Sequence, residues 1–303
     1  MPERVAYDEF SYFHENAEEY GLPYDGPPAV RRESVDLGDG RRLSALVWGT
    51  APPELVLVHG GAQNAHTWDT VAMALGRPLV AVDLPGHGHS DGPSEGRATD
   101  PRSNADDVAV AVRALAPDTR GVVGMSLGGL TSIALAEAHP DLVRALLLVD
   151  VTPGVTGNKA SQIIAFVNGP ESFPSFDEIL ERTIQFNPTR TVSSLRRGIL
   201  HNAVQRDDGS WVWRHARHRA MQAADEGSRP RDYGSLWDAL ERYPGPVMLA
   251  RGMREQSVVT DEDEAELCRR RPDARVEHVA EAGHSLQGDT PLELAALIDA
   301  FIP

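Results

Sequence analysis

Residues 121–130 read GVVGMSLGGL and place Ser126 between glycines in the pattern G-x-S-x-G. The pattern follows a short apolar run directly and opens an apolar helical stretch. A serine on a strand-to-helix turn adopts strained backbone angles, and the flanking glycines leave room for neighbouring chain. An ordinary glycine-rich turn would not need a strand before it and a helix after it. The stretch therefore predicts a nucleophilic hydroxyl at the edge of a sheet.

Apolar runs bounded by turn residues recur on both sides of this stretch and predict buried strands. They lie at residues 43–48, 54–58, 79–83, 121–124, 145–150 and 247–250. Helical patterns alternate with them at residues 102–115, 127–138, 261–271 and 291–301. This alternation predicts an α/β fold with a mostly parallel central sheet and helices on both faces. Thr260 and Thr290 are expected to cap the last two helices.

The alternation stops between Thr152 and about Tyr243, where helical patterns at 176–185 and 192–201 dominate. We expect an inserted helical cap there, with the core assembled from the chain on both sides of it. The predicted division is an N-terminal arm at 1–30, an α/β core at 31–151 and 244–303, and a helical cap at 152–243.

Composition narrows the class of protein. The 303 residues are enough for one large core with an insertion, and the formal net charge of -16 disfavours nucleic acids and anionic membranes as partners. Cys268 is the only cysteine, which excludes an intramolecular disulfide and a thiolate metal cluster. The N-terminus lacks the apolar core of a signal peptide, and no apolar run approaches membrane-spanning length. We expect a cytoplasmic protein with a small-molecule substrate, and a homodimer is compatible with the sequence.

Residues 56–62 read VLVHGGA and form a second candidate segment for chemistry. A strand leads there into a glycine loop whose backbone N–H groups are free to point at a ligand. The N–H groups of Gly61 and Leu127 would hold the negative charge of a tetrahedral intermediate, worth about 3–4 kcal/mol per donor. Ala62 is the alternative donor. His59, at the strand end, is expected to buttress the loop.

Four motifs stand in an order that resembles α/β-hydrolases: the HGG loop at 59–61, the DLPGHGHS turn at 83–90, the elbow around Ser126, and AGHS at 282–285. The resemblance runs from about residue 30 to the C-terminus and weakens in the cap. It implies that Ser126 is the nucleophile and that His284 is the base that takes its proton. It implies neither a cofactor nor a metal.

The acid of the triad has two candidates. The loop after the strand at 247–250, where the family usually carries it, holds Glu255 and no aspartate. Asp150 ends the strand at 145–150, a placement that resembles some lipases and lactonases of this fold. Either carboxylate could orient the imidazole and stabilise its charged form, and Asp150 is the preferred prediction.

Several other residues invite a functional interpretation. The pattern H-x-H-x-D at 87–91 could begin a zinc site, but Gly92 stands where a further ligand would follow, and the segment matches the family's turn. We therefore expect no metal there. Met125, Trp68, Trp211 and Trp213 are candidate substrate contacts, since an indole can bury apolar substrate surface and donate one hydrogen bond. Packing is the favoured role for Trp68, and anchoring of the cap is an equal alternative for Trp211 and Trp213.

The predicted function is a serine hydrolase that cleaves a carboxylic ester or lactone of a small, largely hydrophobic molecule through an acyl-enzyme. A serine nucleophile argues against the dehalogenases and epoxide hydrolases of this fold, which carry aspartate. One alternative is a carbon-carbon bond hydrolase that cleaves diketones. The other is a ligand-binding, receptor-like homologue with little turnover.

Overall fold

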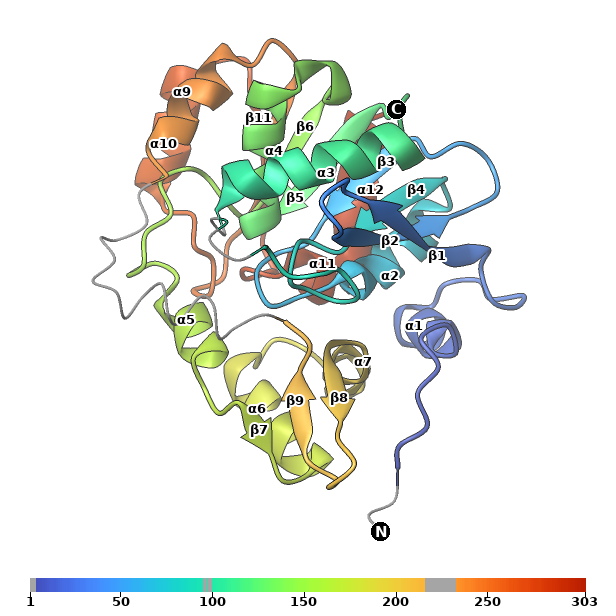
Figure 1. The fold of residues 1–303 in the computed structure, drawn as a ribbon. Helices are drawn as coiled ribbons and strands as arrows, with labels where there is room; N and C mark the ends of the chain where they lie inside the picture. The colour runs from blue at the N-terminus through green and yellow to red at the C-terminus, as the bar shows by residue number, and fades with distance from the viewer. Residues whose placement is uncertain (1–3, 95–96, 98–99, 216–232) are drawn as a thin grey trace.

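An eight-stranded sheet forms the centre of the computed structural model, which describes residues 4–94, 97, 100–215 and 233–303 (Figure 1). Its strands lie in the order β1 (Val30–Asp36), β2 (Arg42–Trp48), β4 (Leu79–Val82), β3 (Leu55–Val58), β5 (Gly121–Met125), β6 (Leu146–Val149), β10 (Val247–Gly252) and β11 (Arg275–Val279). Strand β2 is antiparallel to β1 and to β4, and the other neighbours pair in parallel. The predicted α/β class and mostly parallel sheet are confirmed.

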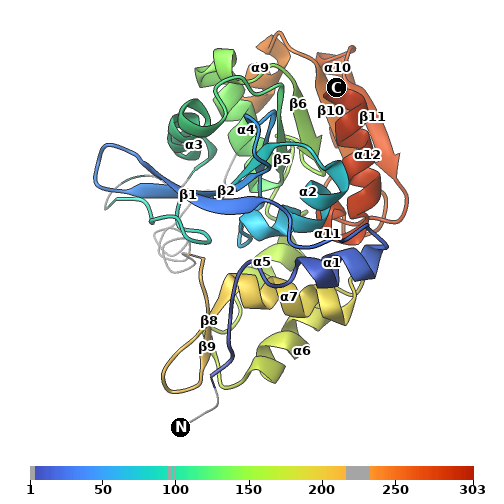
Figure 2. The same ribbon diagram turned by 90° about the vertical axis from the view of Figure 1, so that its right-hand side faces the viewer.

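Helices cover both faces of the sheet (Figure 2). One face carries α3 (Pro101–Leu115), α4 (Leu127–Ala138) and α9 (Ser235–Arg242), and the other carries α2 (Asp69–Leu75) and α12 (Pro291–Phe301). The remaining elements of the core are η1 (Ala65–Trp68), η2 (Pro140–Leu142), α10 (Asp261–Arg270) and α11 (Leu286–Asp289). No helix in the described residues combines the length and the apolar character needed to cross a bilayer.

Each buried strand contributes side chains to two hydrophobic cores, because successive side chains of a strand point to opposite faces of the sheet. In β3, Val56 and Val58 join the cluster under α3 and α4, whereas Leu55 and Leu57 join the cluster under α2 and α12. All four residues are fully buried. The central strands are therefore rigidly packed on both sides, which positions the residues at their carboxyl ends.

Two details of the core differ from the sequence prediction. Strand β1 was not predicted, because it lies at the sheet edge and its sequence VRRESVD contains no apolar run. Thr260 caps α10 through a capping box with Asp263, as predicted. The prediction for Thr290 is wrong, because its side chain makes no capping hydrogen bond to α12. Thr290 directly follows the end of α11, and its backbone, with φ -136° and ψ 59°, is not in the extended conformation typical of an N-cap.

Residues 152–215 form a second layer beside the carboxyl ends of the core strands (Figure 1). The predicted cap extends to residue 243, but residues 216–232 lie outside the described part of the chain. The second layer contains α5 (Ser161–Val167), α6 (Phe176–Phe186) and α7 (Val192–Asn202), together with a small sheet of β7 (Ser172–Phe173), β9 (Trp211–Trp213) and β8 (Ala203–Gln205). Helices α6 and α7 match the predicted patterns. The three strands were not predicted, because runs of two or three residues carry no periodic signal. We call residues 152–215 the cap, since α9 packs on α4 of the core.

The N-terminal arm carries one helix, α1 (Phe13–Tyr20), which lies beside both α2 of the core and α7 of the cap (Figures 1 and 2). Phe13 is buried, and its ring lies 5.2 Å from that of Trp48 in an edge-on contact. Glu15 and Glu19 pair with Arg197 of α7. The arm is thus part of the junction between core and cap.

Candidate active site

The turn between β5 and α4 presents Ser126 in a strained conformation, with φ 51° and ψ -119°. Close packing enforces this turn. A Cβ atom on Gly124 would lie 2.6 Å from the Gly128 carbonyl oxygen, and one on Gly128 would lie 2.2 Å from the Val58 carbonyl oxygen. Because L-residues rarely adopt a positive φ, the strain at Ser126 indicates a functional position.

Ser126 and His284 both line a cavity of about 380 Å³ whose walls come from the core, the cap and the arm. Core residues on its wall include Gly61, Gln63, Met125 and Gln287, and cap residues include Ile163, Phe166, Val167, Phe186 and Trp213. The two predicted catalytic side chains are thus brought to one enclosed space, although 158 positions separate them.

The His284 imidazole is held at one nitrogen and free at the other. Its Nδ1 lies 2.9 Å from Oδ2 of Asp150, and its side chain is 10% exposed. Its Nε2 is buried and has no hydrogen-bond partner among the residues that the structure describes. An ionised carboxylate can only accept a hydrogen bond, so the neutral ring carries its proton on Nδ1 and keeps its lone pair on Nε2.

Asp150 is fully buried at the end of β6, with φ 46°. Besides the imidazole, its carboxylate accepts hydrogen bonds from Gly252 N at 2.9 Å, Ser257 Oγ at 2.6 Å and Val258 N at 3.0 Å. These donors fix the orientation of the carboxylate. All three belong to β10 or the loop after it, the segment where the family resemblance places the acid. That loop supplies donors to a carboxylate on the neighbouring strand.

Glu255, the other candidate acid, lies in the same loop but points elsewhere. Its side chain is exposed, and its Oε1 accepts a hydrogen bond from Gln256 Nε2 at 3.2 Å. Glu255 lines the cavity but makes no hydrogen bond to the His284 imidazole. The structure therefore pairs His284 with Asp150 and not with Glu255.

The two predicted oxyanion donors flank Ser126 on different loops. Leu127 is the first residue of α4, so its N–H has no acceptor within the helix. Gly61 lines the cavity, and its N–H has no hydrogen-bond acceptor among the residues that the structure describes. The N–H of Ala62, the alternative donor, is taken by Nε2 of His87 at 3.1 Å.

His59 and His87 support this loop. His59 Nε2 accepts a hydrogen bond from Leu84 N at 2.9 Å, and its Nδ1 lies 2.7 Å from the Gly60 carbonyl oxygen. Burial lowers the pKa of His59 to about 3, so the ring is neutral. His87 Nδ1 lies 3.0 Å from the Pro85 carbonyl oxygen. Both rings hold backbone groups, as the prediction for His59 expects.

The four side chains predicted to contact substrate separate into two pairs. Met125 and Trp213 line the cavity. Trp68 does not, because it is fully buried in the core cluster under α2 and α12. Trp211 is 4% exposed in the hydrophobic core of the cap, where its ring meets that of Phe176 edge-on. These two tryptophans stabilise packing instead of contacting the cavity.

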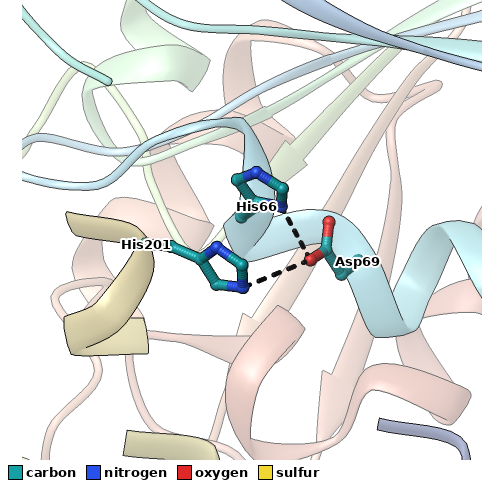
Figure 3. Close-up of side chains that lie close together, drawn as sticks. All are labelled: His66, Asp69 and His201. Carbon is teal, nitrogen blue, oxygen red and sulfur yellow. Dashed lines mark hydrogen bonds and ion pairs between the residues drawn. The ribbon is translucent and has the colours of Figure 1, made fainter. Parts of the chain in front are cut away.

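Sequence reasoning missed a second polar cluster on the cavity wall, formed by His66, Asp69 and His201 (Figure 3). His66 Nδ1 lies 2.9 Å from Asp69 Oδ2, and His66 Nε2 lies 3.1 Å from Glu9 Oε2. Burial disfavours the charged imidazole, but the two carboxylates outweigh it and raise the pKa of His66 to about 9. The three-residue spacing of His66 and Asp69 is visible in the sequence, whereas nothing there connects them to His201.

Comparison with known proteins finds relatives that match most of the chain. The model of the family described as alpha/beta hydrolase family matches residues 55–297. The chain is 44% identical over 304 residues to the esterase Rv0045c of Mycobacterium tuberculosis. The alignment covers 98% of this chain and 96% of that esterase. A solved structure of that esterase, described together with its inhibition by transition metals, has a TM-score of 0.83 at 43% identity and covers 98% of this chain and 99% of its own.

More distant relatives carry different activities. The chain is 29% identical to the sn-1-specific diacylglycerol lipase ABHD11 of Xenopus laevis, over 89% of this chain and 83% of the lipase. It is 28% identical to the 2-(acetamidomethylene)succinate hydrolase of Mesorhizobium japonicum, over 82% of this chain and 88% of that enzyme. Relatives of this fold thus differ in the substrates that their names state.

Proposed function

This chain belongs to the α/β hydrolase family, and from that membership we propose that it is an esterase whose acyl-enzyme forms on Ser126. One observation carries the proposal. The His284 ring is oriented by Asp150 through Nδ1, and its unpaired Nε2 shares a cavity with the strained Ser126. The 44% identity to an esterase over nearly the whole chain supports ester cleavage as the reaction.

In the first half-reaction, Ser126 Oγ attacks the ester carbonyl carbon while His284 Nε2 takes the hydroxyl proton. The carbonyl oxygen becomes an oxyanion, which the N–H groups of Gly61 and Leu127 would stabilise. The C–O bond to the alcohol then breaks, and His284 returns the proton to the leaving oxygen. Asp150 remains ionised throughout and stabilises the imidazolium.

In the second half-reaction, water takes the place of the alcohol. His284 Nε2 removes a proton from the water as its oxygen attacks the acyl carbon, and the same two N–H groups hold the second oxyanion. Collapse of this intermediate breaks the bond to Ser126 Oγ, which regains its proton from His284. The products are a carboxylic acid and the free enzyme.

The wall of the cavity favours a substrate with an apolar body. Helix α5 contributes Ile163, Phe166 and Val167, and the ring of Trp213 in the small sheet of the cap meets that of Phe166 edge-on. Apolar side chains gain by removing hydrocarbon from water, whereas a few polar groups fix the reacting bond. We extend the proposal to lactones, in which the leaving alcohol stays attached to the acyl group. The single cysteine suits a reducing compartment, and we propose a cytoplasmic location.

The test is labelling with a fluorophosphonate probe followed by peptide mapping. We expect one label per chain, on Ser126, and turnover of chromogenic esters that falls about a millionfold in folded Ser126→Ala. Lactones and vinylogous diketones assayed in parallel distinguish ester from carbon-carbon cleavage. A folded protein that takes up no probe, or one that cleaves only diketones, would overturn the proposal.

A further inference from the structure

Three cationic side chains of the cap line the cavity, and they differ in how their charge is balanced. Lys159 Nζ lies 2.7 Å from Asp263, and Arg197 pairs with Glu19. Arg190 lies on the same wall but makes no ion pair with a described residue. We infer that Arg190 binds a carboxylate of the substrate, so that the esters cleaved have an acyl chain that ends in a carboxylate. This inference rests on the proposed esterase function.

Most donors of the Arg190 guanidinium are unused. Nη2 donates to Ser194 Oγ at 2.5 Å, Nε is buried without a partner, and Nη1 makes no hydrogen bond to a described residue. Arginine stays protonated in proteins, and a charge removed from water is costly unless it is paired. The planar fork of Nη1 and the second N–H of Nη2 fits the two oxygens of one carboxylate.

The guanidinium packs against the backbone of α11. A Cβ atom on Gly288 would lie 2.9 Å from both Cζ and Nε of Arg190, so only glycine leaves this space to the guanidinium. The Gly288 carbonyl oxygen accepts a hydrogen bond from the Tyr20 hydroxyl at 3.2 Å. Helix α11 begins two residues after His284. Arg190 is therefore held against the segment that follows the proposed general base.

Two acidic side chains act on the charge of Arg190 without pairing with it. Asp289 Oδ1 accepts a hydrogen bond from Thr189 Oγ1 at 2.9 Å, and its Oδ2 accepts one from a backbone N–H at 2.9 Å. Glu19 is engaged by Arg197. Burial is the main influence on the Arg190 guanidinium and lowers its pKa despite these acids. The protein thus leaves the charge of Arg190 for an outside partner.

Helix α1 of the arm adds neutral polar groups to the same wall. Asn16 and Tyr20 are four residues apart, share one face of the helix, and both line the cavity. Asn16 is 5% exposed, and its side-chain amide makes no hydrogen bond within the described residues. Burial raises the pKa of Tyr20, which keeps its hydroxyl neutral. Together with the apolar side chains of α5, this wall suits a hydrocarbon chain with one polar end.

The proposed reaction favours the acyl portion as the bearer of the carboxylate. The alcohol leaves after the first half-reaction, whereas the acyl group stays on Ser126 until water releases it. An anchor on the acyl chain therefore positions the substrate in both steps. The formal net charge of -16 repels anions in general, so binding one requires an unpaired cation such as Arg190.

The test compares pairs of esters that differ only in charge. One member is the 4-nitrophenyl monoester of adipic, suberic or sebacic acid, and in the other a primary amide replaces the free carboxylate. A hydrogen bond to a charged group corresponds to about 10- to 150-fold, so the unchanged protein should favour the acid in kcat/KM by about tenfold or more for at least one chain length. Spontaneous hydrolysis is subtracted for each ester.

Two substitutions of the arginine should divide this preference. Arg190→Gln should abolish it, mainly through a higher KM for the acid, because the carboxylate is bound before and during the reaction. Arg190→Lys keeps the charge without the fork and should retain part of the preference. Arg196→Gln is the matched control, since it removes the same charge from a side chain of α7 that is 45% exposed, and it should leave the preference unchanged.

Equal kcat/KM for the acid and the amide in every pair would overturn the inference, whatever the variants do. So would a preference that persists in folded Arg190→Gln, or one that Arg196→Gln removes as completely. Fluorophosphonate labelling of Ser126 on the same samples separates the two proposals. A labelled protein that cleaves both members of each pair equally contradicts the carboxylate site alone, whereas a folded protein without labelling or turnover contradicts the esterase function itself.

Discussion

Two buried histidine-aspartate pairs border the same cavity and are alike in their first contact. Nδ1 of His284 lies 2.9 Å from Oδ2 of Asp150, and Nδ1 of His66 lies 2.9 Å from Oδ2 of Asp69. Their surroundings differ. Three further donors satisfy the Asp150 carboxylate, whereas Oδ1 of Asp69 has none in the described residues. Nε2 of His284 is unpaired, but that of His66 lies against Glu9.

The difference shows that the contact between imidazole and carboxylate does not by itself make a general base. A base needs a lone pair that faces the group to be deprotonated. Nε2 of His284 has such a lone pair, and His284 and Ser126 line the same cavity. Both nitrogens of His66 lie against carboxylates, so neither can take a proton from a hydroxyl while those bonds persist. His284 is therefore suited to proton transfer, whereas the two carboxylates raise the pKa of His66 to about 9 and keep its ring charged.

The largest expected effect contrasts the two aspartates. Asp150→Asn should lower kcat about ten-thousandfold, because an amide cannot stabilise the imidazolium or hold the same tautomer of His284. Asp69→Asn should reduce kcat far less, because His66 transfers no proton in the proposed reaction. Steady-state kinetics on a chromogenic ester, with circular dichroism to verify folding, measures both. Equal losses in the two variants would remove the distinction between the pairs.

The next effect isolates the environment of the first carboxylate. Ser257→Ala removes the hydroxyl that donates to Asp150 at 2.6 Å and leaves the two backbone donors in place. A hydrogen bond to a charged group contributes about 1.5–3 kcal/mol, so kcat should fall about 10- to 150-fold while KM changes little. Ser257→Thr keeps the hydroxyl and should restore most of the rate. A matching loss in the threonine variant would indicate a packing effect.

Much of the core could be predicted because its signals are local. The apolar runs and glycine elbow identify strands and the turn at Ser126 without knowledge of distant contacts. Strand β1 could not be found in this way, since edge residues such as Arg31 and Glu33 alternate between exposed and half-buried positions without an apolar run. The short strands of the cap form only because they pair with each other.

The site shows the same limit. Asp150 could be proposed from its place at a strand end, but the choice over Glu255 depends on donors such as Ser257, whose register is set by tertiary structure. The second cluster could not be assembled from the sequence, because His201 meets His66 only after the cap folds onto the core. Long-range pairing of single polar residues leaves no periodic trace.

The smallest expected effect tests the loop that supplies those donors. Glu255 stands two residues before Ser257, yet among the described residues its exposed carboxylate accepts a hydrogen bond only from its neighbour Gln256. Exposed polar contacts of this kind contribute little, so Glu255→Gln should keep kcat within about twofold and leave folding unchanged. Measured beside Asp150→Asn on the same ester, it compares two carboxylates that the sequence alone leaves as rivals. A large loss of kcat in Glu255→Gln would mean that the loop rearranges when substrate binds and that the acid changes strand.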